Sequence, residues 1–393
     1  MVTELLARDW NELAAEERDA FDRLAGGRAR RIVLFGAGGL GRRVLAAVRS
    51  GGLEPVAFAD NDPRKRGTEV DGLPVLSPEE AAVRHGRDAA FVVTIWGAGS
   101  PHRFRHSREQ LTKLGCEVVL PFPALLWQYR AGLPHYLQDL PHKVVRQRDE
   151  VLRAMEIWAD PDSRDEYARQ VRFRLLADFS APGAPVPGRA YFRPELWTPD
   201  PAEHFVDCGA YDGDSLRDFL ADRGARFGRV DALEPDPVNA GRLEAMIAGL
   251  PPDVGTRIHA WRVAAGAAEG FLDFAVTGTV SSASTTAASG AVTRVRCARL
   301  DDLLAGSAPT LIKMDVEGAE VDALLGAEGL IRSARPVLTI CVYHAQDHLW
   351  RIPLWIRDLG LGYRLHLRPH NEEGWDLVCY AVPEARVPAA ARA

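Results

Sequence analysis

The chain of 393 residues is 47% hydrophobic and 26% charged, which excludes a disordered or fibrous protein and allows two or three domains. Its formal net charge of −6, without a long Lys/Arg run, argues against nucleic acid and favours a small or sugar-containing partner. Residues 1–21 are typical of an acidic amphipathic helix rather than a secretory signal, and no apolar run reaches the ~18 residues of a membrane span. We therefore expect a cytoplasmic protein that does not enter a membrane.

The first part of the chain is typical of an open, mainly parallel α/β unit. A glycine-rich turn, GAGGLG at residues 36–41, separates the first predicted strand from a segment with helical periodicity. Predicted strands in this part are residues 30–35, 53–60 and 88–99. Alternating strands and helices predict a parallel sheet, so residues 1–120 are assigned to an N-terminal Rossmann-like nucleotide-binding domain.

The pattern changes after residue 120 and changes back near residue 200. Residues 147–179 have helical periodicity, and residues 181–194 are a Pro/Gly-rich connector, so residues 121–200 are expected to form a helical bridge. Residues 201–393 predict a second, larger α/β domain, in which residues 281–290 are a low-complexity stretch expected to be a mobile loop. Its predicted strands are residues 204–207, 229–235, 257–264, 310–315, 335–344, 362–368 and 376–383.

The first glycine loop meets the conditions for a nucleotide site. Gly36, Gly38 and Gly41 occupy the glycine positions of GxGxxG between a strand and a helix, and Asp60 follows Gly36 by 24 residues. No acid precedes the loop, so its amides could hold a pyrophosphate while Asp60 accepts hydrogen bonds from ribose hydroxyls. NAD or a nucleotide sugar would suit such a site. Alternatively, the glycines only allow tight packing in a domain that binds nothing.

The second glycine loop, FVDCGAYDGDS at residues 205–215, differs by one acid. Asp207 stands two residues before Gly209, where it would repel a pyrophosphate about 4 Å away by on the order of several kcal/mol. The ligand should therefore carry a positive group and no phosphate, as S-adenosylmethionine does. Glu234 closes the next predicted strand 25 residues after Gly209, where it could accept from both ribose hydroxyls. The alternative for both acids is capping of the following helices.

Several segments together resemble, in order and spacing, the FkbM-type S-adenosylmethionine-dependent methyltransferases. They are FVDCGAYDGDS, ALEPDPVN, VAAG at residues 263–266, LDDLL at residues 300–304 and LIKMDVEGAEVDALLGAE at residues 311–328. The resemblance covers about residues 203–382. It implies a seven-stranded sheet with an antiparallel last strand, and methyl transfer to a hydroxyl of a sugar, a glycosylated natural product or a polysaccharide precursor.

Carried over by position, the resemblance implies that Asp207, Gly209, Ala210 and Glu234 contact the cofactor. Tyr211 stands where the wider class prefers glycine, and it is expected at the methionine end. Residues 30–85 are similar to N-terminal nucleotide-binding domains of sugar-modifying enzymes in surface-polysaccharide pathways.

Methyl transfer to an alcohol needs a group that handles the hydroxyl proton. Candidates follow two predicted strands, whose carboxyl ends form the ligand-binding edge of an open sheet: Asp315, Glu317 and His344. We expect His344 to be the base, as a neutral imidazole with a pKa near 6.5, and Asp315 is its rival. Asp315 and Glu317 could instead hold Mg²⁺, or merely cap the next helix.

Two other functions remain open on sequence grounds: an NAD-dependent sugar oxidoreductase working through residues 30–120, and a non-catalytic nucleotide-sugar binding scaffold. The N-terminal unit has no Tyr-x-x-x-Lys pair to relay a proton beside a nicotinamide, which favours methyl transfer. The acceptor and the oligomeric state are not fixed by the sequence, and a homo-oligomer is one option.

Overall fold

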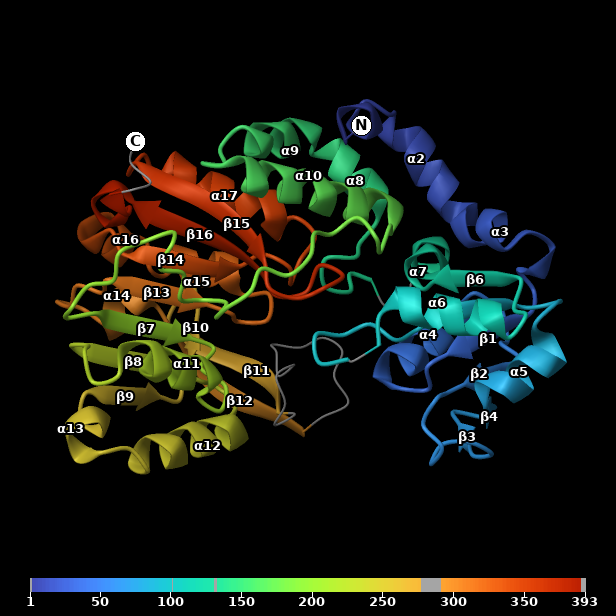
Figure 1. The fold of residues 1–393 in the computed structure, drawn as a ribbon, viewed down its shortest axis with the longest axis horizontal. Coiled ribbons are helices and arrows are strands. Elements are labelled where there is room, and N and C mark those ends of the chain that lie inside the picture. The colour runs from blue at the N-terminus through green and yellow to red at the C-terminus, as the bar shows by residue number, and fades with distance from the viewer. Residues whose placement is uncertain (1, 101, 131–132, 277–290, 390–393) are drawn as a thin grey trace.

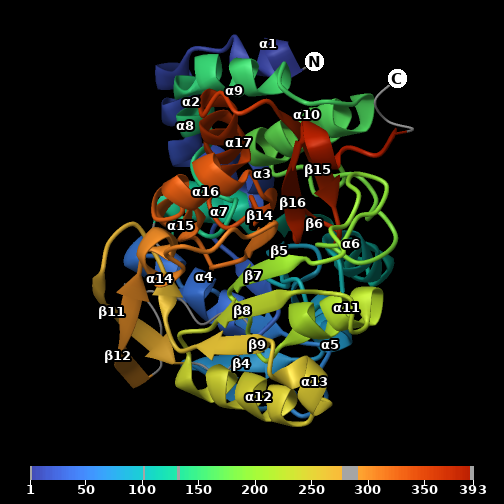
Figure 2. The ribbon, with the colours of Figure 1, turned by 90° about the vertical axis from the view of Figure 1, so that its left-hand side faces the viewer.

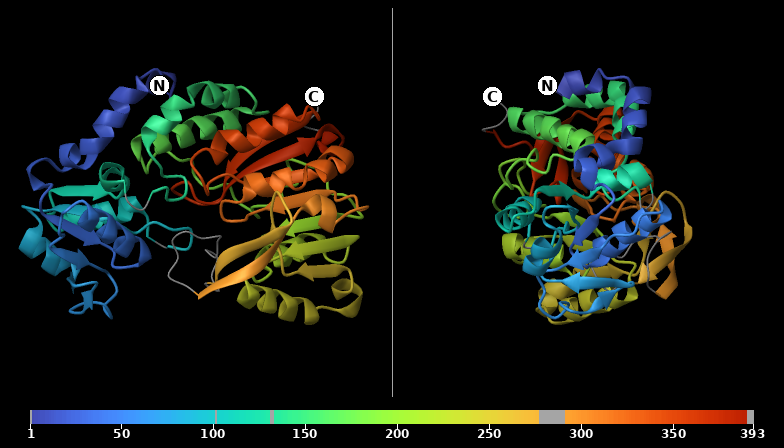
Figure 3. Two further views of the ribbon diagram at one scale, coloured as in Figure 1. Left: turned by 180° about the vertical axis from the view of Figure 1, so that it is seen from behind. Right: turned by 90° about the vertical axis from the view of Figure 1, so that its right-hand side faces the viewer.

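The computed structural model describes residues 2–100, 102–130, 133–276 and 291–389, so the stretch at 281–290 lies outside the described residues. Two α/β lobes lie side by side, with helices above them (Figure 1). The view from behind shows the same arrangement (Figure 3). Within the described ranges, no helix is both long and apolar enough to cross a bilayer.

The N-terminal lobe is built on a six-stranded sheet with the order β3-β4-β2-β1-β5-β6. Its strands are β1 (Ile32–Phe35), β2 (Ala57–Ala59), β3 (Glu69–Val70), β4 (Leu73–Leu76), β5 (Ala90–Val93) and β6 (Val118–Pro121). Every pair is parallel except β3 with β4. All four residues of β1 are buried, as expected for a central parallel strand covered on both faces. The helices of this lobe are α4 (Gly39–Ser50), α5 (Pro78–His85) and α6 (Phe104–Lys113).

The helical part combines the start of the chain with the segment after β6. Its α-helices are α1 (Val2–Leu6), α2 (Trp10–Glu16), α3 (Ala20–Ala25), α7 (Pro123–Tyr129), α8 (Pro141–Arg146), α9 (Arg148–Met155) and α10 (Pro161–Leu176), with short 3₁₀ turns η1 (Glu17–Asp19) and η2 (Gly26–Arg28). Helix α1 packs on α10, α2 on α8 and α3 on α7. The N-terminal helices therefore pack on the helices that follow β6.

Helix α10 attaches this part to the second lobe by its capping residue. Asp160 accepts a hydrogen bond from Ser163 N at 2.8 Å at the helix start, and its carboxylate also binds Arg368 and His366. Both partners lie on β15 (Tyr363–Pro369), and α10 packs along this strand (Figure 2). His366 and Arg368 on β15 thus have a structural partner.

The C-terminal lobe contains a seven-stranded sheet with the order β15-β16-β14-β13-β7-β8-β9. Its other strands are β7 (His204–Cys208), β8 (Arg229–Leu233), β9 (Ile258–Trp261), β13 (Leu311–Met314), β14 (Val337–Cys341) and β16 (Leu377–Pro383). Strand β16 is antiparallel to both of its neighbours, and the remaining pairs are parallel. The predicted α/β class is confirmed, including the seven strands and the antiparallel last strand.

Helices and a small sheet complete this lobe. The helices are α11 (Asp214–Arg223), α12 (Pro237–Ala248), α13 (Pro252–Gly255), α14 (Leu300–Leu303), α15 (Glu320–Leu325), α16 (Glu328–Ala334), α17 (His348–Asp358) and the 3₁₀ turn η3 (Glu384–Arg386). The small sheet has the order β10-β12-β11, with β10 (Ala264–Ala265), β11 (Gly270–Val276) and β12 (Ala291–Ala298).

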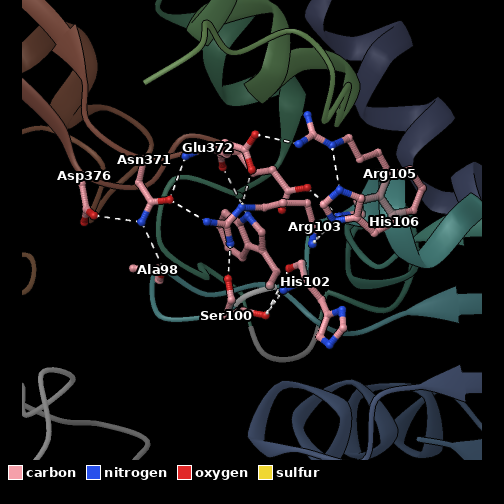
Figure 4. A network of polar contacts seen from close by, with 12 residues as sticks. Ala98, Ser100, His102, Arg103, Arg105, His106, Asn371, Glu372 and Asp376 are labelled. Atoms are coloured by element: carbon pink, nitrogen blue, oxygen red, sulfur yellow. Dashed lines mark hydrogen bonds and ion pairs between the residues drawn. The ribbon is translucent and has the colours of Figure 1, made fainter. Parts of the chain in front are cut away.

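The two lobes meet through the loops that follow β5 and β15 (Figure 4). Arg103 lies 2.8 Å from the Glu372 carboxylate and donates to Asn371 Oδ1 at 2.7 Å. Asn371 in turn donates to the carbonyl of Ala98 at 3.0 Å. Strand β15 runs in the same direction as β14, because both are antiparallel to β16. Both loops therefore leave the carboxyl ends of their strands, and the carboxyl edges of the two sheets face this contact.

Candidate active site

The second glycine loop runs from β7 into α11 and packs directly against the end of β13. Gly209 has φ +81°, and a Cβ there would lie 1.9 Å from the carbonyl oxygen of Asp315, so only glycine fits. Ala210 is buried, and Tyr211 also has a positive φ, of 48°. Such a backbone costs a non-glycine residue roughly 1–2 kcal/mol, so the fold imposes this shape on the loop.

Asp207 lies fully buried at the end of this strand, opposite Lys313 on β13. Lys313 Nζ is 3.0 Å from Asp207 Oδ1 and 2.6 Å from the carbonyl oxygen of Gly209, and Ser215 donates its hydroxyl to the other carboxylate oxygen. Burial by itself would lower the pKa of Lys313, but the Asp207 carboxylate outweighs burial and raises it. The positive group that the sequence analysis expects from the ligand is therefore supplied by Lys313, within the protein.

Sequence reasoning missed Lys313, although it leaves a signal. It is the one charged residue in the otherwise apolar strand Leu311–Met314. A buried charge is normally paired, so a lysine at this position predicts an acid on a neighbouring strand.

Glu234, just after β8, is 5% exposed and holds the glycine loop. Its Oε2 accepts from Tyr211 N at 2.9 Å, and its Oε1 accepts from Asp236 N at 2.8 Å. Burial raises the pKa of Glu234 to about 7. Each carboxylate oxygen can accept two hydrogen bonds, so each keeps one acceptor position. The side-chain cap of α12 is Asp236, so Glu234 does not cap that helix.

Asp315, Glu317 and His344 come together at the same sheet edge, after β13 and β14. One ligand atom from each lies within 4.8 Å of the other two. His344 Nε2 is 3.4 Å from Asp315 Oδ1 and 3.8 Å from Glu317 Oε1. The N-cap residue of α15 is Ala319, which makes no side-chain cap, so neither acid caps this helix. The edge predicted to carry the chemistry therefore carries one compact cluster.

The surroundings of His344 do not favour the neutral imidazole that the sequence analysis expects. Its Nδ1 lies 2.8 Å from Oε1 of Glu320, a fully buried acid at the start of α15. Burial by itself would lower the pKa of His344, but the three surrounding carboxylates raise it to about 10. Glu320 was missed from the sequence because nothing local distinguishes it from a surface acid of a helix.

The first glycine loop borders a cavity of about 720 Å³. A Cβ at Gly38 or Gly39 would meet nothing within 4 Å, whereas one at Gly41 would lie 2.0 Å from the Gly36 carbonyl oxygen. Gly36 and Gly41 therefore allow packing, and Gly38 leaves the start of α4 open. That helix has no side-chain cap and no acid in its first turn, whereas α11 has Asp214 there. The first loop suits an anion better than the second.

Asp60 repeats the geometry of Glu234 in the N-terminal lobe. It accepts from Ala37 N of its loop at 2.8 Å and from Asp62 N at 2.8 Å, and Lys65 Nζ lies 3.0 Å away. Burial raises the pKa of Asp60, but these hydrogen bonds outweigh burial and lower it. Asp60 is therefore an anion that already has a cationic partner at the cavity wall.

Aromatic rings connect this cavity with the cluster. Trp96 lines the cavity, and its ring centroid is 4.5 Å from that of Trp375. The Trp375 ring is 4.8 Å from that of Tyr136, whose hydroxyl donates to Glu317 Oε2 at 3.4 Å. A continuous set of packed side chains thus runs between the two lobes.

Comparison with known proteins gives a match for the C-terminal lobe and for the fold. The crystal structure of methyltransferase FkbM from Methylobacillus flagellatus KT is similar over 97% of this chain and 99% of that chain, with a TM-score of 0.75 and 23% identity, which shows a shared fold. UDP-D-quinovosamine 4-dehydrogenase from Vibrio fischeri matches over 26% of this chain and 87% of that chain at 24% identity, with a TM-score of only 0.21. No curated protein matches the sequence. The family model of the methyltransferase FkbM domain matches residues 207–365, so the C-terminal lobe of this chain contains a methyltransferase FkbM domain.

Proposed function

We propose that this protein is an S-adenosylmethionine-dependent O-methyltransferase whose acceptor is a hydroxyl of a sugar, in a glycosylated natural product or a polysaccharide precursor. The observation that carries the proposal is the direct packing of Gly209 against the backbone of Asp315. This contact joins the cofactor loop to the charged cluster, so a methyl donor and an oxygen nucleophile would meet at one sheet edge.

The residues of this edge have separable tasks. S-adenosylmethionine supplies an electrophilic methyl group on a sulfonium. Glu234 accepts the ribose hydroxyls, and Ala210 and Tyr211 shape the loop beside the methionine end. We favour Asp315 over His344 as the residue that handles the acceptor's proton, either directly or through a bound metal ion, because the three carboxylates around His344 raise its pKa. Tyr191 holds Asp315 Oδ2 at 2.8 Å and leaves Oδ1 facing the cluster.

The N-terminal cavity is proposed to hold an anionic part of the acceptor, such as the diphosphate of a nucleotide sugar. The open start of α4 supplies the amides, and Lys65 and His102 line the same cavity. We favour a nucleotide sugar over NAD because the carboxyl edges of both sheets face the same contact, and Trp96 connects the cavity with the cluster. Under this proposal, the N-terminal lobe selects the acceptor and takes no part in the chemistry.

Calorimetry with S-adenosylmethionine tests the cofactor assignment. Glu234→Ala should weaken binding by roughly 1.5–3 kcal/mol, a factor of about 10–150, because a charge-assisted hydrogen bond is lost. Glu244→Ala, which removes an acid of α12 that pairs with Arg262, is the matched control and should bind normally. Wild-type affinity in a folded Glu234→Ala variant would reject the assignment.

Mass spectrometry of sugar nucleotides incubated with enzyme and cofactor then tests for an added methyl group.

A further inference from the structure

We propose that Asp315, Glu317 and His344 bind a divalent metal ion with mixed nitrogen and oxygen coordination, such as Mn²⁺, Co²⁺ or Zn²⁺. The role of this ion in methyl transfer rests on the proposed function, but its binding does not. Three observations carry the proposal: an unpartnered histidine nitrogen, a set of outer hydrogen bonds that orient all three side chains, and an open side.

The first observation concerns His344 Nε2. The side chain of His344 is 1% exposed, and Nε2 has no hydrogen-bond partner among the described residues. Its two nearest carboxylate oxygens lie at 3.4 and 3.8 Å, on Asp315 and Glu317. Buried polar atoms are rarely left without a partner, and this one points at two acids. An ion between the three side chains would displace the proton from Nε2 and give all three of them a partner.

The second observation is that each of the three side chains is held at its far atom. Glu320 binds Nδ1 of His344 at 2.8 Å, and Tyr191 donates to Oδ2 of Asp315 at 2.8 Å. Tyr136 donates to Oε2 of Glu317 at 3.4 Å. Metal-binding histidines and carboxylates typically have such outer partners, which fix the ring and direct the free atom at the ion. Here Nε2, Oδ1 and Oε1 are the atoms left facing one another.

The third observation is access. The side chains of Asp315 and Glu317 are 26% and 19% exposed, so the cluster is open on the carboxylate side and closed behind the imidazole. Catalytic metal sites keep such an open position for water or substrate. Glu317 also has φ +52°, a strained conformation that brings its carboxylate beside that of Asp315.

The ligand types indicate which ions the site prefers. Carboxylates suit Mg²⁺ and Mn²⁺, whereas imidazole favours the later divalent ions of the first transition row, so the mixed set should accept Mn²⁺ and prefer Co²⁺ or Zn²⁺. Such an ion would orient the acceptor's hydroxyl oxygen and lower the pKa of that hydroxyl. As the new carbon–oxygen bond forms, the carbon–sulfur bond breaks, and the hydroxyl proton leaves to water.

Metal binding to the full chain tests the proposal without any turnover. Protein treated with a chelator and dialysed is titrated with Mn²⁺, and free Mn²⁺ is followed by electron paramagnetic resonance, with Mg²⁺, Co²⁺ and Zn²⁺ as competitors. We expect one Mn²⁺ per chain, displaced by Co²⁺ or Zn²⁺ at lower concentration than by Mg²⁺. His344→Gln and Asp315→Asn should abolish binding. Glu320→Gln, a change to a positioning residue, should weaken binding about 10- to 100-fold.

His204→Gln is the matched control, because His204 also pairs with a buried acid, Asp231 at 2.7 Å, but lies at the start of β7 on the opposite sheet edge. It should bind Mn²⁺ normally.

If a cluster variant does not fold, the wild-type protein still tests the proposal, since Mn²⁺ should raise its melting temperature and Co²⁺ should give visible absorption bands of a nitrogen–oxygen site. Wild-type protein that binds neither ion at millimolar concentration overturns the proposal, as does full binding by His344→Gln. Methyl transfer that survives chelation would leave the proposed function intact and remove the metal's role in it. Metal binding by a protein that does not bind S-adenosylmethionine would support the metal site and reject the proposed function.

Discussion

Lys313 and Asp207 face each other on neighbouring strands, with Nζ 3.0 Å from Oδ1 and both side chains removed from solvent. This pair changes what Asp207 indicates about the ligand of the second glycine loop. The carboxylate that distinguishes the second loop from the first is neutralised inside the protein. The exposed acid that follows this loop is instead Asp214, in the first turn of α11.

Removal of the lysine should destabilise the protein. Lys313→Met leaves Asp207 buried without a counter-charge, and loss of one partner of a buried pair costs about 3–5 kcal/mol. Urea denaturation should show this loss in the free energy of unfolding. The double variant Asp207→Asn/Lys313→Met removes both charges and should recover most of it. Equal stability of Lys313→Met and wild type would show that the pair is not essential to the fold.

Cofactor binding should depend on pH through Glu234. Its pKa is raised to about 7, so the carboxylate gains a proton as the pH falls through 7 and no longer accepts from both ribose hydroxyls. Affinity for S-adenosylmethionine should therefore fall by about tenfold between pH 8 and pH 6, following the ionised fraction. Calorimetry at several pH values measures this. Glu234→Gln should bind weakly with little pH dependence, and a similar slope in both proteins would assign the effect to another group.

A single substitution can separate charge from shape at the N-terminal cavity. Gly39 begins α4, and a Cβ there meets nothing within 4 Å, so a side chain can be accommodated. Gly39→Asp should abolish binding of UDP or NAD by repulsion, although an acid in the first turn favours the helix itself. Gly39→Ala is the control and should retain binding in the same calorimetric titration. Equal binding by both variants would mean that the phosphates do not lie at this helix start.

The contact between the lobes should matter for the acceptor and not for the cofactor. Arg103, 13% exposed, binds Glu372 and Asn371 beside the cavity. Arg103→Ala should lower turnover at limiting acceptor by about tenfold, because a charged hydrogen-bond pair is lost, and should leave the affinity for S-adenosylmethionine unchanged.

The neighbouring Arg105 provides the control for that experiment. Arg105 also reaches Glu372, at 3.0 Å, but is 60% exposed, so Arg105→Ala should have little effect. Steady-state kinetics and cofactor titrations of both variants decide the matter. A loss of cofactor affinity in Arg103→Ala would show that this contact supports the methyltransferase lobe itself.

The sequence alone predicted the seven strands of the second lobe's main sheet, β1, β2 and β5 of the first sheet, the two glycine loops and the acids that follow β2 and β8. These features depend on residues that are close together in the sequence. A buried parallel strand is a run of apolar residues, and the tight turn that follows it requires glycine. The candidate residues Asp315, Glu317 and His344 could also be predicted, because strand ends of a parallel sheet share one edge.

Only the tertiary structure decided the charge of these groups. Whether Asp207 is neutralised and whether His344 carries a proton depend on Lys313 and Glu320, which are remote in sequence from the residues they control. Electrostatic interactions act across the few ångströms between neighbouring strands and helices and grow with burial, and neither quantity is local to a motif. The meeting of the two lobes at Arg103 and Glu372 likewise joins loops that follow strands of different sheets, which no periodicity in the sequence can reveal.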